Sequence, residues 1–264
     1  MRPFVLGITG ISSAGKSTVC NALSKRFAGQ ATLVALDDFY WVRPALLTDT
    51  CHVSRHFPYC SCADPAAGTR SDPIRLGRTC PDLTLIISQP GPAKAESDGI
   101  INYDHPDKID FDTFVETLRR QIAQVSAQLV PGSAPTERPF IIVEGFLILH
   151  NPEARELIDD VLFLKISREE ALRRRLVRVW PVDYIPVCSN SGHNGPFPGI
   201  ACAEPTNYFD KYVWPMYQQF GSALDGDGST FARPVIHEIE AEVSPETLAA
   251  DVTAVCERLL AIER

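Results

Sequence analysis

The feature that most constrains this chain is a glycine-rich segment close to its first residue. Residues 10–17 read Gly-Ile-Ser-Ser-Ala-Gly-Lys-Ser and match the pattern G-x-x-x-x-G-K-[ST] in full. An apolar run at 3–9 precedes them, and helical spacing of apolar residues continues to about residue 28. This pattern is informative when it stands between a strand and a helix. The sequence therefore predicts a strand that ends in a phosphate-binding loop at the start of a helix.

The residue types in this loop have chemical reasons. Gly10 and Gly15 let the backbone curl until successive N–H groups point at phosphate oxygens, and the helix N-terminus adds positive charge. Lys16 is expected to reach the β- and γ-phosphates of a nucleotide, and the Ser17 hydroxyl to bind Mg²⁺. The other nucleotide-binding candidates in the segment are Ile11, Ser12, Ser13, Ala14 and Thr18. A plain Gly-Ser turn is the alternative, which the completeness of the motif and its context disfavour.

Strand and helix signals alternate along the rest of the chain. Strands are predicted at 31–36, 140–143, 161–166 and 234–239, of which 140–143 is a continuous apolar run, and helices are predicted at 111–130, 168–179, 205–223 and 244–262. This alternation predicts one α/β domain over 1–264, a three-layer sandwich with a parallel sheet between helices. Two Pro-containing stretches, about 45–100 and 185–205, break the rhythm and are interpreted as irregular insertions, with an incorrect gene model as the alternative.

Composition excludes several classes of protein. The chain has 25 Lys and Arg against 33 Asp and Glu, a net charge of −8, which disfavours a nucleic-acid partner. Its apolar runs are too short to span a membrane, and its start does not look like a cleavable signal, so a cytoplasmic (or nuclear) location is expected. The eight cysteines are expected to be free thiols rather than zinc ligands. The sequence leaves the oligomeric state open, with a monomer as the expectation.

Two carboxylates and a cluster of arginines favour a kinase among nucleotide-binding proteins. Asp37 follows the predicted strand 31–36 and could accept a proton from an attacking hydroxyl and bind Mg²⁺. Glu144 ends the strand at 140–143, where an acidic residue commonly holds the Mg²⁺ shell. A helix cap at Asp37 and a solvated carboxylate at Glu144 are the alternatives. No N/T-K-x-D motif of a guanine-binding protein is present.

The arginines follow the strand at 161–166 and predict a lid at about 168–184 that folds over the phosphates. A solvated helix face is the alternative interpretation. The lid arginines are Arg168, Arg173, Arg174, Arg175 and Arg178.

These motifs together resemble those of the nicotinamide riboside kinases, within the wider uridine kinase and phosphoribulokinase group. The resemblance covers residues 1–44, 99–184 and 205–264. Its motifs are Gly-Ile-Thr-Gly-Ile-Ser-Ser-Ala-Gly-Lys-Ser-Thr at 7–18, Asp-Asp-Phe-Tyr at 37–40, Ile-Ile-Val-Glu-Gly-Phe at 141–146, Arg-Arg-Arg-Leu-Val-Arg-Val-Trp at 173–180 and Tyr-Phe-Asp-Lys-Tyr-Val-Trp-Pro-Met-Tyr at 208–217.

The resemblance implies ATP and Mg²⁺ as cofactors and a ribose 5′-hydroxyl as the phosphate acceptor. Asp37 would be the base and a metal contact beside Ser17 and Glu144. Tyr103 would stack on the pyridine ring opposite Trp180, where the family usually has Tyr, and Asp104 would accept hydrogen bonds from the ribose hydroxyls. An aromatic sandwich suits a cationic nicotinamide ring.

Further roles are implied by the same resemblance. Arg174 and Arg178 would contact ATP, with Arg174 counted among the catalytic groups, and Arg175 would approach the substrate. The adenine site would lie near Ser244, and Trp180 would border the nucleotide. The remaining substrate-side candidates are Asp38, Phe39, Tyr40 and Pro181.

The segment that follows Tyr103 keeps other acceptors open. Its Asp-His-Pro-Asp sequence at 104–107 is closer to the uridine kinase pattern than to that of the riboside kinases. A uridine/cytidine kinase is therefore the alternative enzyme. Because the first insertion lies on the substrate side, a catalytically degenerate ATP-binding regulatory protein is the alternative outside enzymes.

Overall fold

The centre of the protein is a sheet of five parallel strands. The computed structural model describes residues 2–40, 102–130, 132, 134, 138–177, 207–221 and 234–262. The strands lie in the order β2-β3-β1-β4-β5. Their bounds are Val5–Thr9 for β1, Ala31–Ala35 for β2, Phe140–Glu144 for β3, Asp160–Lys165 for β4 and Val235–Glu240 for β5. All five predicted strands are confirmed.

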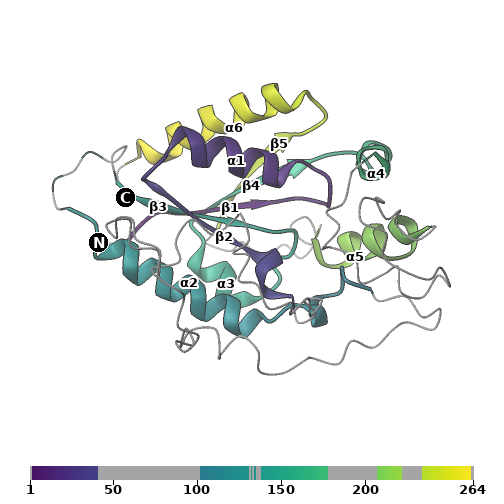
Figure 1. Ribbon diagram of the computed structural model, residues 1–264, viewed down its shortest axis with the longest axis horizontal. Coiled ribbons are helices and arrows are strands. Elements are labelled where there is room, and N and C mark those ends of the chain that lie inside the picture. Colours follow the sequence, from purple (N-terminus) through teal and green to yellow (C-terminus); the bar gives the residue numbers. More distant parts are fainter. Residues whose placement is uncertain are drawn as a thin grey trace, which may run out of the picture.

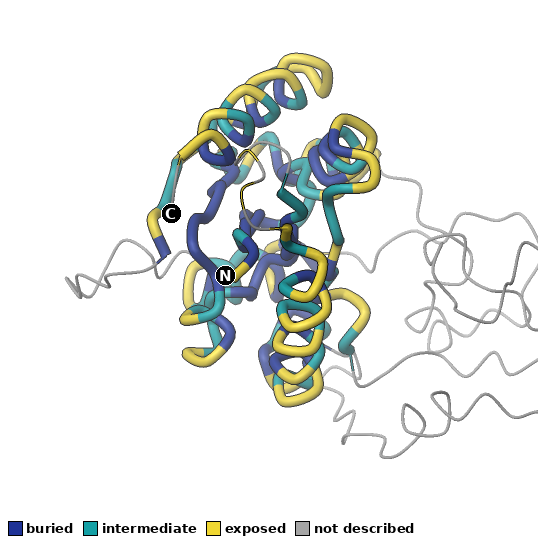
Figure 2. The backbone as a smooth tube through the Cα atoms, turned by 90° about the vertical axis from the view of Figure 1, so that its left-hand side faces the viewer, coloured by how far each residue is buried: buried dark blue, intermediate teal, exposed yellow. Residues whose placement is uncertain are grey.

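Helices cover both faces of this sheet, as the alternating pattern predicted. Helices α1 (Lys16–Arg26) and α6 (Pro245–Leu260) lie together on one face, and α2 (Phe111–Ser126) and α3 (Pro152–Leu157) lie on the other (Figure 1). The exposed residues of these helices turn outward, and the three central strands β1, β3 and β4 are buried between them (Figure 2). The three-layer α/β sandwich is therefore confirmed for the described part of the chain.

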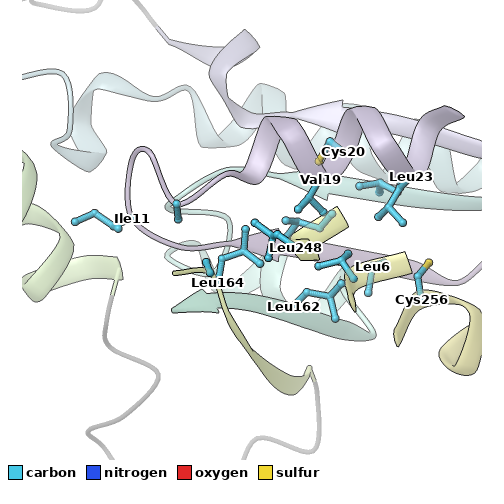
Figure 3. Close-up of a cluster of buried hydrophobic side chains, with 14 of the residues drawn as sticks. Leu6, Ile11, Val19, Cys20, Leu23, Leu162, Leu164, Leu248 and Cys256 are labelled. Carbon is cyan, nitrogen blue, oxygen red and sulfur yellow. The ribbon is translucent and has the colours of Figure 1, made fainter. Parts of the chain in front are cut away.

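The strand β1 contributes to both halves of the core because its side chains alternate between the faces of the sheet. Leu6 and Ile8 are fully buried against α1 and α6, in a cluster that includes Leu23 and Leu248 (Figure 3). Val5 belongs to the cluster on the opposite face. A strand that is buried on both faces reads as a continuous apolar run, which is the pattern seen in the sequence.

Local signals explain where the long helices begin. Asp110 caps α2, since its carboxylate accepts a hydrogen bond from the N–H of Thr113 at 3.0 Å. Ser244 caps α6 in the same way through the N–H of Thr247 at 3.1 Å. The apolar stripe of α2 is buried at Phe114, Val115, Leu118 and Val125.

The predicted helix at 205–223 is helical over its described part but has an unexpected form. Two π-helical segments, Phe209–Val213 and Tyr217–Gly221, flank a single α-helical turn, α5 (Trp214–Met216). Pro215 explains the departure, because it has no N–H to donate and its ring clashes with the carbonyl four residues earlier. A wider helix on either side accommodates such a defect.

The shorter helices α3 and α4 agree only in part with the predictions. Helix α3 was not predicted. Helix α4 (Arg168–Leu176) confirms the start of the Arg-rich helix, whereas residues 178–184 of the proposed lid and both proposed insertions lie outside the described residues. No helix in the described ranges has the length and apolar character needed to cross a bilayer.

Candidate active site

Three strands end side by side at one edge of the sheet. Glu144, the last residue of β3, pairs with Ala35 of β2 on one side and with Ile8 of β1 on the other. The chain leaves β1 into the glycine-rich loop, and it leaves β2 into a 3₁₀ helix, Leu36–Phe39. Asp37 lies in that 3₁₀ helix, so the carboxylate expected to act as a base is on the same side of the sheet as the loop.

The loop has the backbone that its glycines predicted. Gly10 has φ +143°, and a Cβ atom at this position would lie 2.6 Å from the carbonyl oxygen of Leu164. Gly15 has φ +103° and precedes α1, whose N-terminus has no side-chain cap. Ser13 also has a positive φ of 69°, and its hydroxyl oxygen is buried without a hydrogen-bond partner. The loop therefore holds a strained backbone and an unsatisfied polar group at the place where phosphate is expected.

Lys16 folds back over this loop. Its ammonium group donates hydrogen bonds to the carbonyl oxygens of Gly10 and Ile11, each at 3.1 Å. Burial raises the pKa of the Glu144 carboxyl group, and the positive charge of Lys16 offsets part of that rise. Lys16 is thus positioned between the curled backbone and the carboxylate at the end of β3.

Glu144 is the electrostatic centre of the site. The Ser17 hydroxyl donates a hydrogen bond to it at 2.8 Å, and the Cys20 thiol donates another. Burial raises the pKa of Glu144, and the nearby charge of Asp37 raises it further, whereas Lys16 and both hydrogen bonds lower it. Asp37 and Glu144 follow the ends of the neighbouring strands β2 and β3, which places the two carboxylates at the same edge of the sheet.

These residues fit a nucleotide with Mg²⁺. Among the described residues, no group of three or more His, Cys, Asp and Glu side chains is arranged to hold a metal ion. The proposed ligands are two carboxylates, Asp37 and Glu144, and the Ser17 hydroxyl. Mg²⁺ commonly takes only one or two protein carboxylates and completes its shell with water and phosphate oxygens. The partnerless Ser13 hydroxyl and the uncapped N-terminus of α1 are suited to those phosphates.

The segment from 102 to 110 packs beside the base. Tyr40 forms an antiparallel bridge with Ile109, and the N–H of Asp110 donates to the carbonyl of Phe39 at 2.8 Å. The ring of Phe39 packs edge-on against Phe114 of α2, with ring centres 5.3 Å apart. Phe39 and Tyr40 are therefore partly buried against the core, while Asp38, like Asp37, is exposed.

Tyr103 and Asp104 form a tight turn in this segment. The N–H of Asp104 donates to the side-chain oxygen of Asn102 at 3.2 Å, and both of these polar side chains are buried. The Tyr103 hydroxyl is buried without a hydrogen-bond partner, and burial raises its pKa. The predicted sandwich with Trp180 stays a prediction, because Trp180, Pro181 and Arg178 lie outside the described residues.

Arg174 links α4 to the chain that leaves β5. Its guanidinium donates to Glu170 at 2.7 Å and to the carbonyl oxygen of Ala241, also at 2.7 Å. This places Arg174 close to the predicted adenine site, although the Ser244 hydroxyl is engaged as the cap of α6. Arg173, by contrast, is exposed and pairs with Glu170, which matches the solvated-face interpretation for that residue.

Arg175 has a different environment from its neighbours. It is 7% exposed, and it donates a hydrogen bond to the hydroxyl of Ser12 in the glycine-rich loop at 2.6 Å. Its guanidinium carbon lies 5.7 Å from the centre of the Tyr208 ring. Arg175 therefore lies between the glycine-rich loop and Tyr208 of the 207–221 segment.

Sequence reasoning missed two residues of the site. Tyr208 was part of a recognised motif without a role, and its hydroxyl contacts both Tyr103 and Asp104. Cys20 was expected only to be a free thiol. It is buried, but its thiol also donates to Glu144, and burial raises the pKa of that thiol. Helical spacing could have indicated Cys20, which lies one turn after Ser17 on α1.

Comparison with known proteins gives relatives of two kinds. No family model matches the chain. It is 25% identical over 228 residues to a probable uridine-cytidine kinase of Caenorhabditis elegans, with 83% of this chain and 71% of the relative covered. It is 22% identical over 222 residues to nicotinamide riboside kinase 1 of Homo sapiens, with 83% and 77% covered. A uridine kinase of Lactiplantibacillus plantarum is 24% identical over 188 residues, with 67% and 68% covered.

The likeness to solved structures is looser. A gluconokinase from Sinorhizobium meliloti aligns with a TM-score of 0.43 and 13% identity, covering 98% of this chain and 94% of the gluconokinase. The fold assignment therefore depends on the sheet described above. The sequence matches show that the chain is similar to nicotinamide riboside kinases and to uridine kinases, the two groups that its motifs indicated.

Proposed function

We propose that this homologue of the nicotinamide riboside and uridine kinases is an ATP-dependent nucleoside kinase, with the ribose 5′-hydroxyl of nicotinamide riboside as its acceptor. Nicotinic acid riboside is a second substrate of the same kind. The observation that carries the proposal is the common edge of the sheet, where the glycine-rich loop, the Ser17–Glu144 pair and Asp37 meet. The product would be the 5′-mononucleotide, a precursor for NAD biosynthesis.

The residues at this edge divide the work of phosphoryl transfer. When bound, ATP with Mg²⁺ supplies the phosphoryl group and neutralises part of its charge. Lys16 and the backbone N–H groups of residues 10–17 would hold the phosphates, and Ser17, Asp37 and Glu144 would hold the metal. Asp37 accepts the proton of the acceptor hydroxyl as that oxygen bonds to phosphorus and ADP departs. Arg174 compensates negative charge from the α4 side.

Two features bear on the acceptor. The Tyr103 ring and the buried Asp104 carboxylate offer a stacking surface and a hydrogen-bond acceptor, as a nucleoside requires. A pyrimidine nucleoside is the second candidate, favoured by the similarity to a probable uridine-cytidine kinase and by the Asp-His-Pro-Asp sequence at 104–107.

A nucleoside panel tests the proposal. The purified full chain is incubated with Mg²⁺ and ATP and, separately, with nicotinamide riboside, nicotinic acid riboside, uridine or cytidine. ADP release is coupled to a spectrophotometric assay and each product is identified by mass spectrometry. Asp37→Asn protein, purified in parallel, controls for contaminating kinases. We expect the highest kcat/KM with nicotinamide riboside.

Other outcomes would contradict the proposal in distinct ways. Turnover of uridine or cytidine without turnover of nicotinamide riboside would show that the acceptor is a pyrimidine nucleoside, while the proposed kinase activity would stand. ATP binding without phosphorylation of any nucleoside would favour the degenerate regulatory protein. Repeating the panel with GTP decides which nucleotide is the donor.

A further inference from the structure

The hydroxyl group of Tyr208 joins two parts of the chain that lie far apart in sequence. It accepts a hydrogen bond from the N–H of Tyr103 at 2.9 Å and donates one to a carboxylate oxygen of Asp104 at 3.2 Å. Tyr208 is 4% exposed and precedes the first π-helical segment, where its ring packs against Tyr212. One side chain from the 207–221 segment therefore fixes both the backbone and the carboxylate of the acceptor-side turn.

The ring of Tyr208 reaches the glycine-rich loop through an arginine. The Arg175 guanidinium lies over that ring, 5.7 Å from its centre, and donates to the Ser12 hydroxyl at 2.6 Å. Attraction between a cation and an aromatic face is stronger when both groups are removed from water, as they are here. The contacts thus run continuously from Ser12 through Arg175 and Tyr208 to Asp104.

The protonation state of Tyr208 suits this arrangement. Burial raises its pKa well above the usual range for tyrosine, and the neighbouring Asp104 charge raises it further. The hydroxyl therefore keeps its proton and can donate to the carboxylate while its oxygen accepts from the Tyr103 N–H. This matches the directions of the two hydrogen bonds.

We propose that Tyr208 is a positioning residue for the acceptor nucleoside: its hydroxyl holds the Tyr103–Asp104 turn, and its ring aligns that turn with the phosphate loop through Arg175. The inference rests on the proposed function, since it assigns Tyr208 to the nucleoside side of that same site. Tyr208 itself need not touch the substrate. It acts through Asp104, whose carboxylate accepts the hydrogen bond from the Tyr208 hydroxyl.

The variant Tyr208→Phe tests the hydroxyl alone, because it retains the ring and its contact with Arg175. We expect kcat/KM for the nucleoside to fall about 10-fold, the scale of one lost hydrogen bond to a charged group. The KM for ATP should change less than twofold. As a matched control, Val125→Ala removes buried volume near the far end of α2. The Val125→Ala variant should lower the melting temperature without changing the KM for the nucleoside more than the KM for ATP.

A double-mutant cycle distinguishes positioning from general destabilisation. If Tyr208 acts through Asp104, adding Tyr208→Phe to Asp104→Asn should change kcat/KM less than twofold, because the carboxylate it orients is already gone. Additive effects of the two substitutions, or an equal rise in both KM values in the single variant, would overturn the inference.

Hydrogen exchange tests the contact without any activity. In free Tyr208→Phe protein, peptides covering residues 102–108 should exchange faster than in the wild type, while peptides of α6 should not change. Unchanged exchange at 102–108 would overturn the structural half of the inference. A wild-type protein that phosphorylates no nucleoside would refute the proposed function and the acceptor half, and the exchange data would still decide whether Tyr208 holds the turn.

Discussion

The contact between Gly145 and Leu36 offers a direct way to move the proposed base without altering it. Gly145 follows Glu144 at the end of β3, and Leu36 immediately precedes Asp37. A Cβ atom at Gly145 would lie 2.4 Å from the Cβ of Leu36, whereas ordinary contacts begin at 3.4 Å. Gly145→Ala must therefore push the Leu36 backbone away by about 1 Å, and Asp37 moves with it.

The size of the effect follows from that displacement. A misplacement of about 1 Å in a catalytic group can lower the rate about 10²-fold. We expect kcat to fall by this factor. The Kd for ATP should change little, because the glycine-rich loop follows β1 and not the strand that precedes Leu36. Overpacking should also lower the free energy of unfolding by about 1–3 kcal/mol, in addition to the cost of placing alanine at the positive φ of Gly145.

Gly29→Ala is the matched control. Gly29 has φ +82°, so alanine is strained there as well, but an added Cβ would meet no atom within 4 Å. It should lose about 1 kcal/mol of stability and keep the wild-type kcat. Steady-state kinetics, calorimetric titration with ATP and urea denaturation provide the three measurements. Folded Gly145→Ala protein with wild-type kcat would refute the argument that this spacing positions Asp37.

Three further predictions concern the site and its surroundings. Asp37→Asn should cut kcat at least about 10²-fold with nearly unchanged ATP affinity, measured by the coupled assay and by titration. Ser13→Gly should raise the melting temperature of the ligand-free protein by about 2–4 °C, because glycine adopts the positive φ with less strain and the substitution removes a buried hydroxyl without a partner. Burial, together with the charge of Arg155, lowers the pKa of His150. Since the unfolded chain then binds the proton more readily, stability should fall as the pH drops below about 6.5, and the melting temperature of His150→Gln should fall less over that range.

The parts of the fold that the sequence predicted have strong local signals. The strand 140–143 is a continuous apolar run, and the segment 161–166 is apolar except for Lys165. The helix starting at residue 111 has a regular apolar stripe and an Asp cap. The glycine-rich loop is specified by its motif, because few backbone paths satisfy two glycines with positive φ before a helix. The position of Asp37 followed from the rule that carboxyl ends of parallel strands meet at one edge.

The parts that could not be predicted depend on packing between distant residues. The contact of Tyr208 with Asp104 joins positions 104 residues apart, and no local pattern encodes it. The π-helical form of 209–221 needs the surroundings of Pro215, since a proline alone indicates only that the helix is disturbed. Helix α3 is different, because its Asn151 cap followed by Pro152 was a readable signal that was overlooked in a short segment.

The bridge between Tyr40 and Ile109 has an evolutionary consequence. The bridge holds Tyr40 and Ile109 next to each other beside the sheet. The part of the chain between these two residues therefore begins and ends at neighbouring positions. The entropy lost by closing such a loop grows only with the logarithm of its length, about 0.6 kcal/mol for each doubling. Descendants of one ancestor could therefore lengthen or shorten this stretch freely while the strands stay in register.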